Sequence, residues 1–194
     1  MERELILTGI GGQGIQLASV ALSRAAVDEG REVQVFGSYG GMMRGGATEA
    51  TIVVADAPVE APPTVSATWS AVLMHHDFAG PTLARLRPGS VVFVNTTVIR
   101  GLDLKDAWQV VEVAASDLAV EVGNIMTASM VMIGAYAAVT GLIRLESLVA
   151  ASTASLPAYR TQHAALNEEA LRRGWSSVAA GSAPAWPVAS GVVE

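Results

Sequence analysis

The chain has 194 residues, of which 51% are hydrophobic and 15% charged, and its formal net charge is −6. This length fits one domain with a substantial core. Because so few residues are charged, much of the surface must be uncharged, which favours a subunit partly covered by another chain. The excess of Asp and Glu over Lys and Arg disfavours a nucleic-acid partner, since phosphates are neutralised by basic patches.

Two further sequence features restrict the class of protein. The chain has no cysteine, so it can form neither disulfides nor a thiolate-held iron–sulfur cluster. Its first residues, MERELILTG, lack the basic and apolar segments of a signal peptide, which predicts a cytoplasmic protein. Residues 122–143 carry no charge and are long enough to span a bilayer. Their glycine, asparagine, serine and threonine residues instead predict a helix buried inside the protein, and no membrane span.

The N-terminal third has the pattern of alternating strands and helices. Residues 4–8 form an apolar run that predicts a strand, residues 15–29 have helical spacing that ends at Gly30, and residues 33–36 predict a second strand. A strand, a helix and a strand in about 30 residues predict a βαβ unit, with a parallel strand pair and a right-handed crossover. The glycine-rich residues 37–46 predict a loop.

The later segments extend this pattern to a single α/β domain. Further strands are predicted at 49–55, 71–74, 90–95 and 109–113, and helices at 78–86, 125–139, 145–155 and 159–173. Together they predict a Rossmann-like, mostly parallel sheet with helices on both faces over residues 1–174. Residues 175–194, rich in Ala, Ser, Gly and Pro, predict an extended C-terminal arm that is ordered against a partner chain.

The stretch Gly9-Ile10-Gly11-Gly12-Gln13-Gly14 has the glycine spacing of a dinucleotide-binding loop and stands between a predicted strand and helix. Glycines let the backbone approach a pyrophosphate, and the helix N-terminus supplies N–H groups and a positive dipole end. A tight turn without a ligand is the alternative. The nicotinamide interpretation is weakened because the second strand ends Phe36-Gly37-Ser38, without the acid that would hold the ribose. A P-loop is excluded because Ile15 stands where its lysine should be.

No set of side chains predicts a catalytic or metal site. His75-His76-Asp77 is the only His/Asp cluster, and neighbouring strand residues point to opposite faces. His163 is predicted to be an exposed helical histidine. Arg44 differs from these, because glycines on both sides let its planar guanidinium meet an anion at close range. A surface arginine in a flexible loop is the alternative.

"GIGGQG" followed by "SYGGMMRGG" resembles the gamma subunit, or gamma domain, of the 2-oxoacid:acceptor (ferredoxin) oxidoreductases. Those enzymes use thiamine diphosphate and coenzyme A to convert a 2-oxoacid to an acyl-CoA. Two later stretches also fit: "GNIMTASMVMIGAY", with Asn124 and Gly134, and "ALNEEALRRG", with Asn167, Ala170 and Gly174. The resemblance runs from residue 4 to about residue 174. Gly41 and Met42 replace a Pro and a Glu of the family, and Ser70 replaces an Asp.

The resemblance implies a non-catalytic subunit that contributes to coenzyme A binding beside a thiamine site. Alpha, beta and possibly ferredoxin-like delta subunits would carry the thiamine diphosphate and the iron–sulfur clusters, with ferredoxin or NAD(P) as the electron acceptor of the complex. The 2-oxoacid stays open, although the carboxylate lost at Met42 favours an apolar or aromatic one. The implied cofactor-binding residues are Gly9, Gly11, Gly12, Gln13, Gly14, Ser38, Tyr39, Gly40, Arg44, Gly45, Gly46 and Asn124.

Two other interpretations remain. One is a free-standing Rossmann-like reductase or nucleotide sensor, which would need its own ribose contact and catalytic residue. The other is a scaffold whose loops contact only neighbouring chains.

Overall fold

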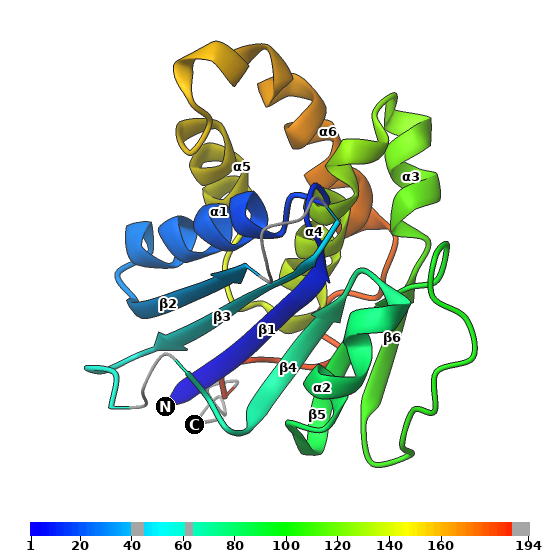
Figure 1. Cartoon of the computed structure of the whole chain (residues 1–194). Coiled ribbons are helices and arrows are strands. Elements are labelled where there is room, and N and C mark those ends of the chain that lie inside the picture. The colour runs from blue at the N-terminus through cyan, green and yellow to red at the C-terminus, as the bar shows by residue number, and fades with distance from the viewer. Residues whose placement is uncertain (40–44, 61–63, 188–194) are drawn as a thin grey trace, which may run out of the picture.

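Six strands form one mixed sheet in a computed structural model that describes residues 1–39, 45–60 and 64–187 (Figure 1). The strand order is β2-β3-β1-β4-β5-β6. The strands are β1 (Glu2–Ile10), β2 (Glu32–Tyr39), β3 (Ala47–Ala55), β4 (Thr68–Leu73), β5 (Leu86–Asn95) and β6 (Gln109–Val113).

Within this sheet only β3 runs against the other five strands. β1, β4, β5 and β6 pair in parallel, whereas β3 pairs antiparallel with both β1 and β2. The predicted mostly parallel α/β sheet is confirmed, but the predicted direct pairing of the first two strands is wrong. β3 follows β2 after a short connection and pairs back along it, from Tyr39↔Thr48 to Glu32↔Ala55. A short connection favours antiparallel pairing of β3 with β2. Since β3 also pairs with β1, it lies between the two strands.

Helices cover both faces of the sheet. Alternate strand residues such as Leu7, Val72 and Phe93 belong to a core formed with α1 and α4, and their neighbours Leu73 and Val92 belong to a second core beside α2. Figure 1 shows α2 in front of β4 and β5 and the larger helices on the other side. The helices are α1 (Ile15–Asp28), α2 (Ala79–Leu83), α3 (Ala115–Val122), α4 (Ala128–Thr140), α5 (Leu145–Ala154) and α6 (Ala164–Ser176), with short 3₁₀ turns η1 (His76–Phe78), η2 (Ile125–Thr127) and η3 (Ala158–His163).

The uncharged stretch at 122–143 contains an interior helix, as predicted. Every residue of α4 is buried. In the part of the chain that the structure describes, no helix has both the length and the hydropathy needed to cross a bilayer. α3 precedes this stretch and was not among the predicted helices.

α4 crosses α6 at a contact made by two glycines. A Cβ at Gly134 would collide with the carbonyl of Leu171, and a Cβ at Gly174 would collide with the carbonyl of Val131. Both collisions are with backbone atoms, which cannot move aside as a flexible side chain can. The two helices therefore pack with their backbones in contact, and any larger residue at either position would separate them.

The C-terminal segment packs on the chain itself as far as Trp186. Backbone N–H groups of Gly181, Ala183 and Ala185 donate to carbonyls at the end of α4, which have no partner within the helix. Trp186 donates from Nε1 to the Leu142 carbonyl (3.2 Å) and lies under the guanidinium of Arg31. The region predicted as an arm from residue 175 therefore begins with the last residues of α6 and continues along α4. Residues 188–194 lie outside the described part.

Replacing Gly174 by alanine is expected to lower the free energy of unfolding by about 3 kcal/mol or more, because the methyl group would force two helix backbones apart. Thermal or urea unfolding of the purified chain measures this. Gly80→Ala is the matched control, since a Cβ at Gly80 in α2 meets no atom within 4 Å. Equal stability of the two variants would contradict the backbone contact.

Candidate ligand-binding site

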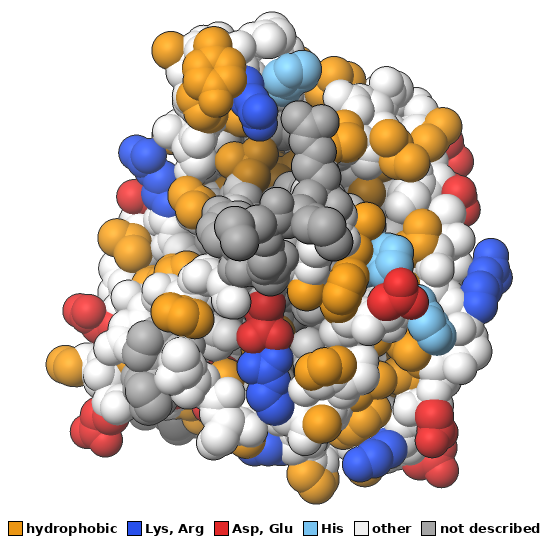
Figure 2. Space-filling model, viewed as in Figure 1, with side chains coloured by type: hydrophobic (Ala, Val, Ile, Leu, Met, Phe, Trp, Pro, Cys, Tyr) orange, Lys and Arg blue, Asp and Glu red, His pale blue; other side chains and the backbone are white. Residues whose placement is uncertain are grey.

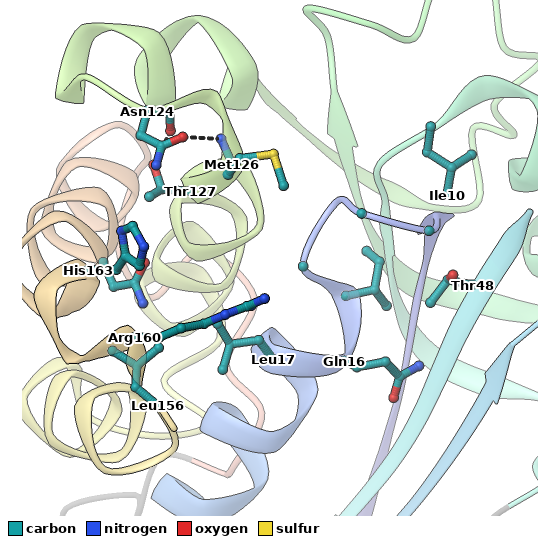
Figure 3. A pocket seen from close by; sticks show the side chains of 15 residues that line it. Ile10, Gln16, Leu17, Thr48, Asn124, Met126, Thr127, Leu156, Arg160 and His163 are labelled. Carbon is teal, nitrogen blue, oxygen red and sulfur yellow. Dashed lines mark hydrogen bonds between the residues drawn. The ribbon is translucent and has the colours of Figure 1, made fainter. Parts of the chain in front are cut away.

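A cavity of about 570 Å³ lies between the glycine loop and a helical wall formed by Leu156, η3 and α6 (Figure 3). Its volume is that of a site for a cofactor-sized ligand. The residues that line it are Ile10, Gly11, Gly12, Gly14, Ile15, Gln16, Leu17, Thr48, Asn124, Met126, Thr127, Leu156, Arg160, His163 and Asn167. Gly11, Gly12, Gly14 and Asn124 come from the set that the sequence predicts to bind a cofactor.

The glycine loop connects β1 to α1 through two left-handed residues. Gly12 has φ 102° and Gly14 has φ 77°, a region that side chains rarely adopt. A Cβ at Gly14 would also lie 2.6 Å from the Oγ of Ser129 in α4. Glycine at position 14 therefore allows both the turn and the close approach of the loop to α4.

Two other residues of the motif hold the loop in place. Gln13 accepts a hydrogen bond at Oε1 from the Ile10 amide (2.9 Å) and donates from Nε2 to the Met74 carbonyl (3.0 Å). Gly9 lies in β1, where a Cβ would collide with that same Oε1. The Gln13 amide thus ties the loop to the end of β4, and neither residue lines the cavity.

The N-terminus of α1 faces the cavity without a cap of its own. Gly14 is its N-cap residue and offers no side chain, and the first turn contains no acidic residue. The first N–H groups of a helix have no partner within the helix, and the helix dipole makes this end positive. Such an end is suited to bind an anion.

The second glycine segment lies beside the first. The Gly11 amide donates to the Gly46 carbonyl (2.8 Å), and Ile10 pairs with Ala47 in the antiparallel β1–β3 ladder. Gly45 and Gly46 therefore adjoin the glycine loop through β3, rather than through the parallel strand pair that the sequence suggested.

The other predicted residues of this segment do not line the cavity or are not described. Ser38 is exposed in β2, which continues through Tyr39, so the loop predicted at 37–46 begins later than expected. Pairing with β3 extends the strand through these residues. Gly40, Met42 and Arg44 lie outside the described residues.

Asn124 reaches the cavity from the opposite side. Its Oδ1 accepts a hydrogen bond from the Met126 amide (3.0 Å) and so caps η2 (Figure 3). Thr127 donates from Oγ1 to the Asn124 carbonyl (2.8 Å). These bonds fix the asparagine at the cavity edge and leave its Nδ2 as a donor.

The helical wall was missed in the sequence. It consists of Leu156, Arg160, His163 and Asn167. The sequence points to Asn167 only as part of a family motif and to His163 only as an exposed helical histidine, and to neither as part of a site. Spacings of three or four residues put these side chains on one face, which is the sequence signal that could have identified the wall. His163, predicted as exposed, is partly buried. The Nδ2 of Asn167 is buried without a hydrogen-bond partner.

The His75-His76-Asp77 cluster and Ser70, which were noted in the sequence, do not line this cavity. His75 accepts from the Asp77 amide at Nδ1 (3.3 Å) and caps η1. Among the described residues, no three His, Asp or Glu side chains are grouped to hold a metal ion.

Ser70 is buried in β4, where its Oγ lies 3.1 Å from the Tyr136 hydroxyl. Burial raises the pKa of that tyrosine far above its ordinary value. Ser70 is therefore a core residue.

On the face shown in Figure 2 the described Lys and Arg side chains are dispersed, and some of them lie against Asp or Glu side chains. The donors that an anion could use at the cavity are therefore local, and are backbone amides and a few side chains.

Residues 4–177 match the family model of the pyruvate ferredoxin/flavodoxin oxidoreductases. The chain belongs to this family. It is 30% identical to the 2-oxoglutarate synthase subunit KorC of Methanothermobacter marburgensis, over 81% of this chain and 88% of that one. It is also 30% identical to the common gamma subunit of the pyruvate/ketoisovalerate oxidoreductases of Thermococcus kodakarensis, over 75% and 82%.

The fold of a solved family member agrees with this membership. The gamma subunit of a keto/oxoacid ferredoxin oxidoreductase from Geobacter sulfurreducens superimposes with a TM-score of 0.78 at 26% identity, covering 91% of this chain and 95% of that one. The resemblance based on the glycine motifs is confirmed at the level of the family, and so is the single α/β domain.

Asn124→Ala is expected to reduce stability by about 1 kcal/mol, because the Met126 amide loses its capping oxygen. Asn124→Asp keeps an acceptor oxygen and should retain most of the stability of the parent chain. Thermal unfolding of both variants measures the difference. Equal destabilisation by alanine and aspartate would show that the cap is not what Asn124 contributes.

Proposed function

We propose that the chain is the gamma-type subunit of a thiamine diphosphate- and coenzyme A-dependent 2-oxoacid:acceptor oxidoreductase, in which it binds coenzyme A. The observation that carries the proposal is the uncapped N-terminus of α1, which faces a cavity that Asn167, with its unpartnered Nδ2, lines from the other side. Among the described residues that line the cavity there is no carboxylate. A site with free donors and no carboxylate is suited to a phosphate-bearing ligand.

The cavity residues fit the nucleotide end of coenzyme A. Backbone amides at Gly12 and in the first turn of α1 would bind the diphosphate. Leu17 and Leu156 line the same cavity and offer an apolar surface to the adenine. The thiol at the other end of the molecule would extend toward a partner subunit, where the acyl group is transferred.

The chain's own residues do not supply the redox chemistry in this proposal. Thiamine diphosphate and iron–sulfur clusters would be held by alpha, beta and possibly delta subunits, and ferredoxin or NAD(P) would accept the electrons of a cytoplasmic complex. Since the chain has no cysteine, a cluster must be ligated elsewhere. The part of this chain is to position coenzyme A and to shape the edge of the active site.

A free-standing nicotinamide-dependent reductase has less support. Its ribose-binding acid would stand at the end of the second strand, but β2 ends Gly37-Ser38-Tyr39 and is separated from β1 by β3. We expect the purified chain alone to oxidise no 2-oxoacid, with or without coenzyme A, in an assay with dye, ferredoxin or NAD(P) as acceptor. Turnover by the chain alone would favour the reductase.

Gly11→Val is expected to raise the KM for coenzyme A of the assembled complex about tenfold or more, because its methyl groups crowd the phosphates away from the backbone. The fold should tolerate the change, since a Cβ at Gly11 lies 3.6 Å from its nearest neighbour, the Gly45 amide nitrogen. Steady-state kinetics measures the KM, with Gly80→Val as the control. An unchanged KM in an intact complex would remove this loop from the site.

We also propose that Arg44 pairs with an anionic group of coenzyme A or of the substrate. Loss of such a pair costs at least about 2 kcal/mol, so Arg44→Ala should lower kcat/KM about 30-fold. Arg44→Lys should restore little, because an ammonium group cannot replace a planar fork of donors. Size-exclusion chromatography of the variants distinguishes a ligand-binding role of Arg44 from a role in holding the subunits together. A dissociated complex indicates an interface residue, and normal turnover by both variants contradicts the proposal.

A further inference from the structure

We propose that Arg160 and His163 bind a second phosphate of the ligand, apart from the diphosphate at the glycine loop. In coenzyme A this group is the 3′-phosphate of the ribose, so the helical wall would distinguish coenzyme A from 3′-dephospho-coenzyme A. This inference rests on the proposed function and assigns a role to residues that lie outside the glycine motifs.

The guanidinium of Arg160 is free to bind a ligand. Among the described residues it has no hydrogen-bond acceptor and no carboxylate partner, and its central carbon lies 5.5 Å from the ring centre of its neighbour Tyr159. The arginines that pair with Glu side chains are Arg85, Arg87, Arg144, Arg172 and Arg173. Although the chain has more Asp and Glu than Lys and Arg, Arg160 in the cavity wall has no acidic partner among the described residues.

Three donor side chains stand on one face of this wall. Arg160, His163 and Asn167 are three and four residues apart across η3 and α6, and all line the cavity. Asn167 is only 4% exposed and its Nδ2 has no partner. A buried amide without a hydrogen bond is costly, and a small movement of this side chain would let Nδ2 donate to a ligand in the cavity.

The opposite wall provides a separate set of donors. Backbone amides of the glycine loop and of the first turn of α1 are enough for one anionic group. Figure 3 shows the side chain of Arg160 extending across the cavity toward Leu17 of α1, with His163 beside it. Two donor sets on facing walls suit a ligand with two separate anionic groups. The diphosphate and the 3′-phosphate of coenzyme A, on either side of one ribose, are such a pair.

The test compares coenzyme A with 3′-dephospho-coenzyme A in the assembled complex. The parent complex should show a KM about tenfold higher for the dephospho form, which is the effect of losing one charge-assisted hydrogen bond. Arg160→Ala should raise the KM for coenzyme A about tenfold and leave that for the dephospho form unchanged, so the two values converge. His163→Gln, which keeps one donor, should have a smaller effect in the same direction.

Arg100→Ala is the matched control, because Arg100 is also exposed and does not line the cavity. It should change neither KM. Equal use of both ligands by the parent complex, or an equal rise in both KM values in Arg160→Ala, would overturn the inference and leave coenzyme A binding at the glycine loop intact. If Gly11→Val and Arg160→Ala both leave the KM for coenzyme A unchanged, the proposed function itself fails.

Discussion

The cavity depends on the backbone contact between α4 and α6. Gly134 and Gly174 let the two helices touch, and this fixes α6 and its buried Asn167 relative to the core. The same helix α4 meets the glycine loop at the contact between Gly14 and Ser129. Both walls of the cavity are therefore positioned by one fully buried helix. A buried helix of this kind provides the rigid support that a binding site requires.

The reversed strand β3 has a comparable effect at the sheet edge. By pairing with β1 from Ile10↔Ala47 onward, it brings Gly46 within hydrogen-bond distance of Gly11. The two glycine segments are distant in sequence but form one surface. If β1 and β2 paired directly, as the sequence suggested, the β1–β3 ladder that holds Gly46 beside Gly11 would not exist. The insertion of β3 therefore places Gly46 next to the glycine loop, at the edge of the sheet where α/β folds commonly bind ligands.

The parts of the fold that follow from local patterns could be predicted. Residues 109–113 form β6 as expected, and the charge-free composition before Gly141 predicted the buried α4. What depends on distant partners could not be predicted. The position of β3 is decided by pairing in the sheet, and the C-terminal segment is ordered by carbonyls at the end of α4. The wall with Arg160 shows helical spacing, but nothing local indicates that this face meets the glycine loop.

A chain with a net charge of −6 can still offer a site for an anionic ligand, because no carboxylate is among the described residues that line its cavity. Carboxylates such as Glu49, Glu121 and Glu146 are paired with arginines. Unpaired surface charges act weakly beyond about 8 Å at physiological ionic strength. Inside the cavity the nearest groups are backbone amides, an amide side chain, a guanidinium and an imidazole, and these decide the local potential. Net charge therefore bears on long-range attraction to polyanions such as nucleic acids, whereas recognition of a small phosphate-bearing ligand depends on a few donors held in place by α4.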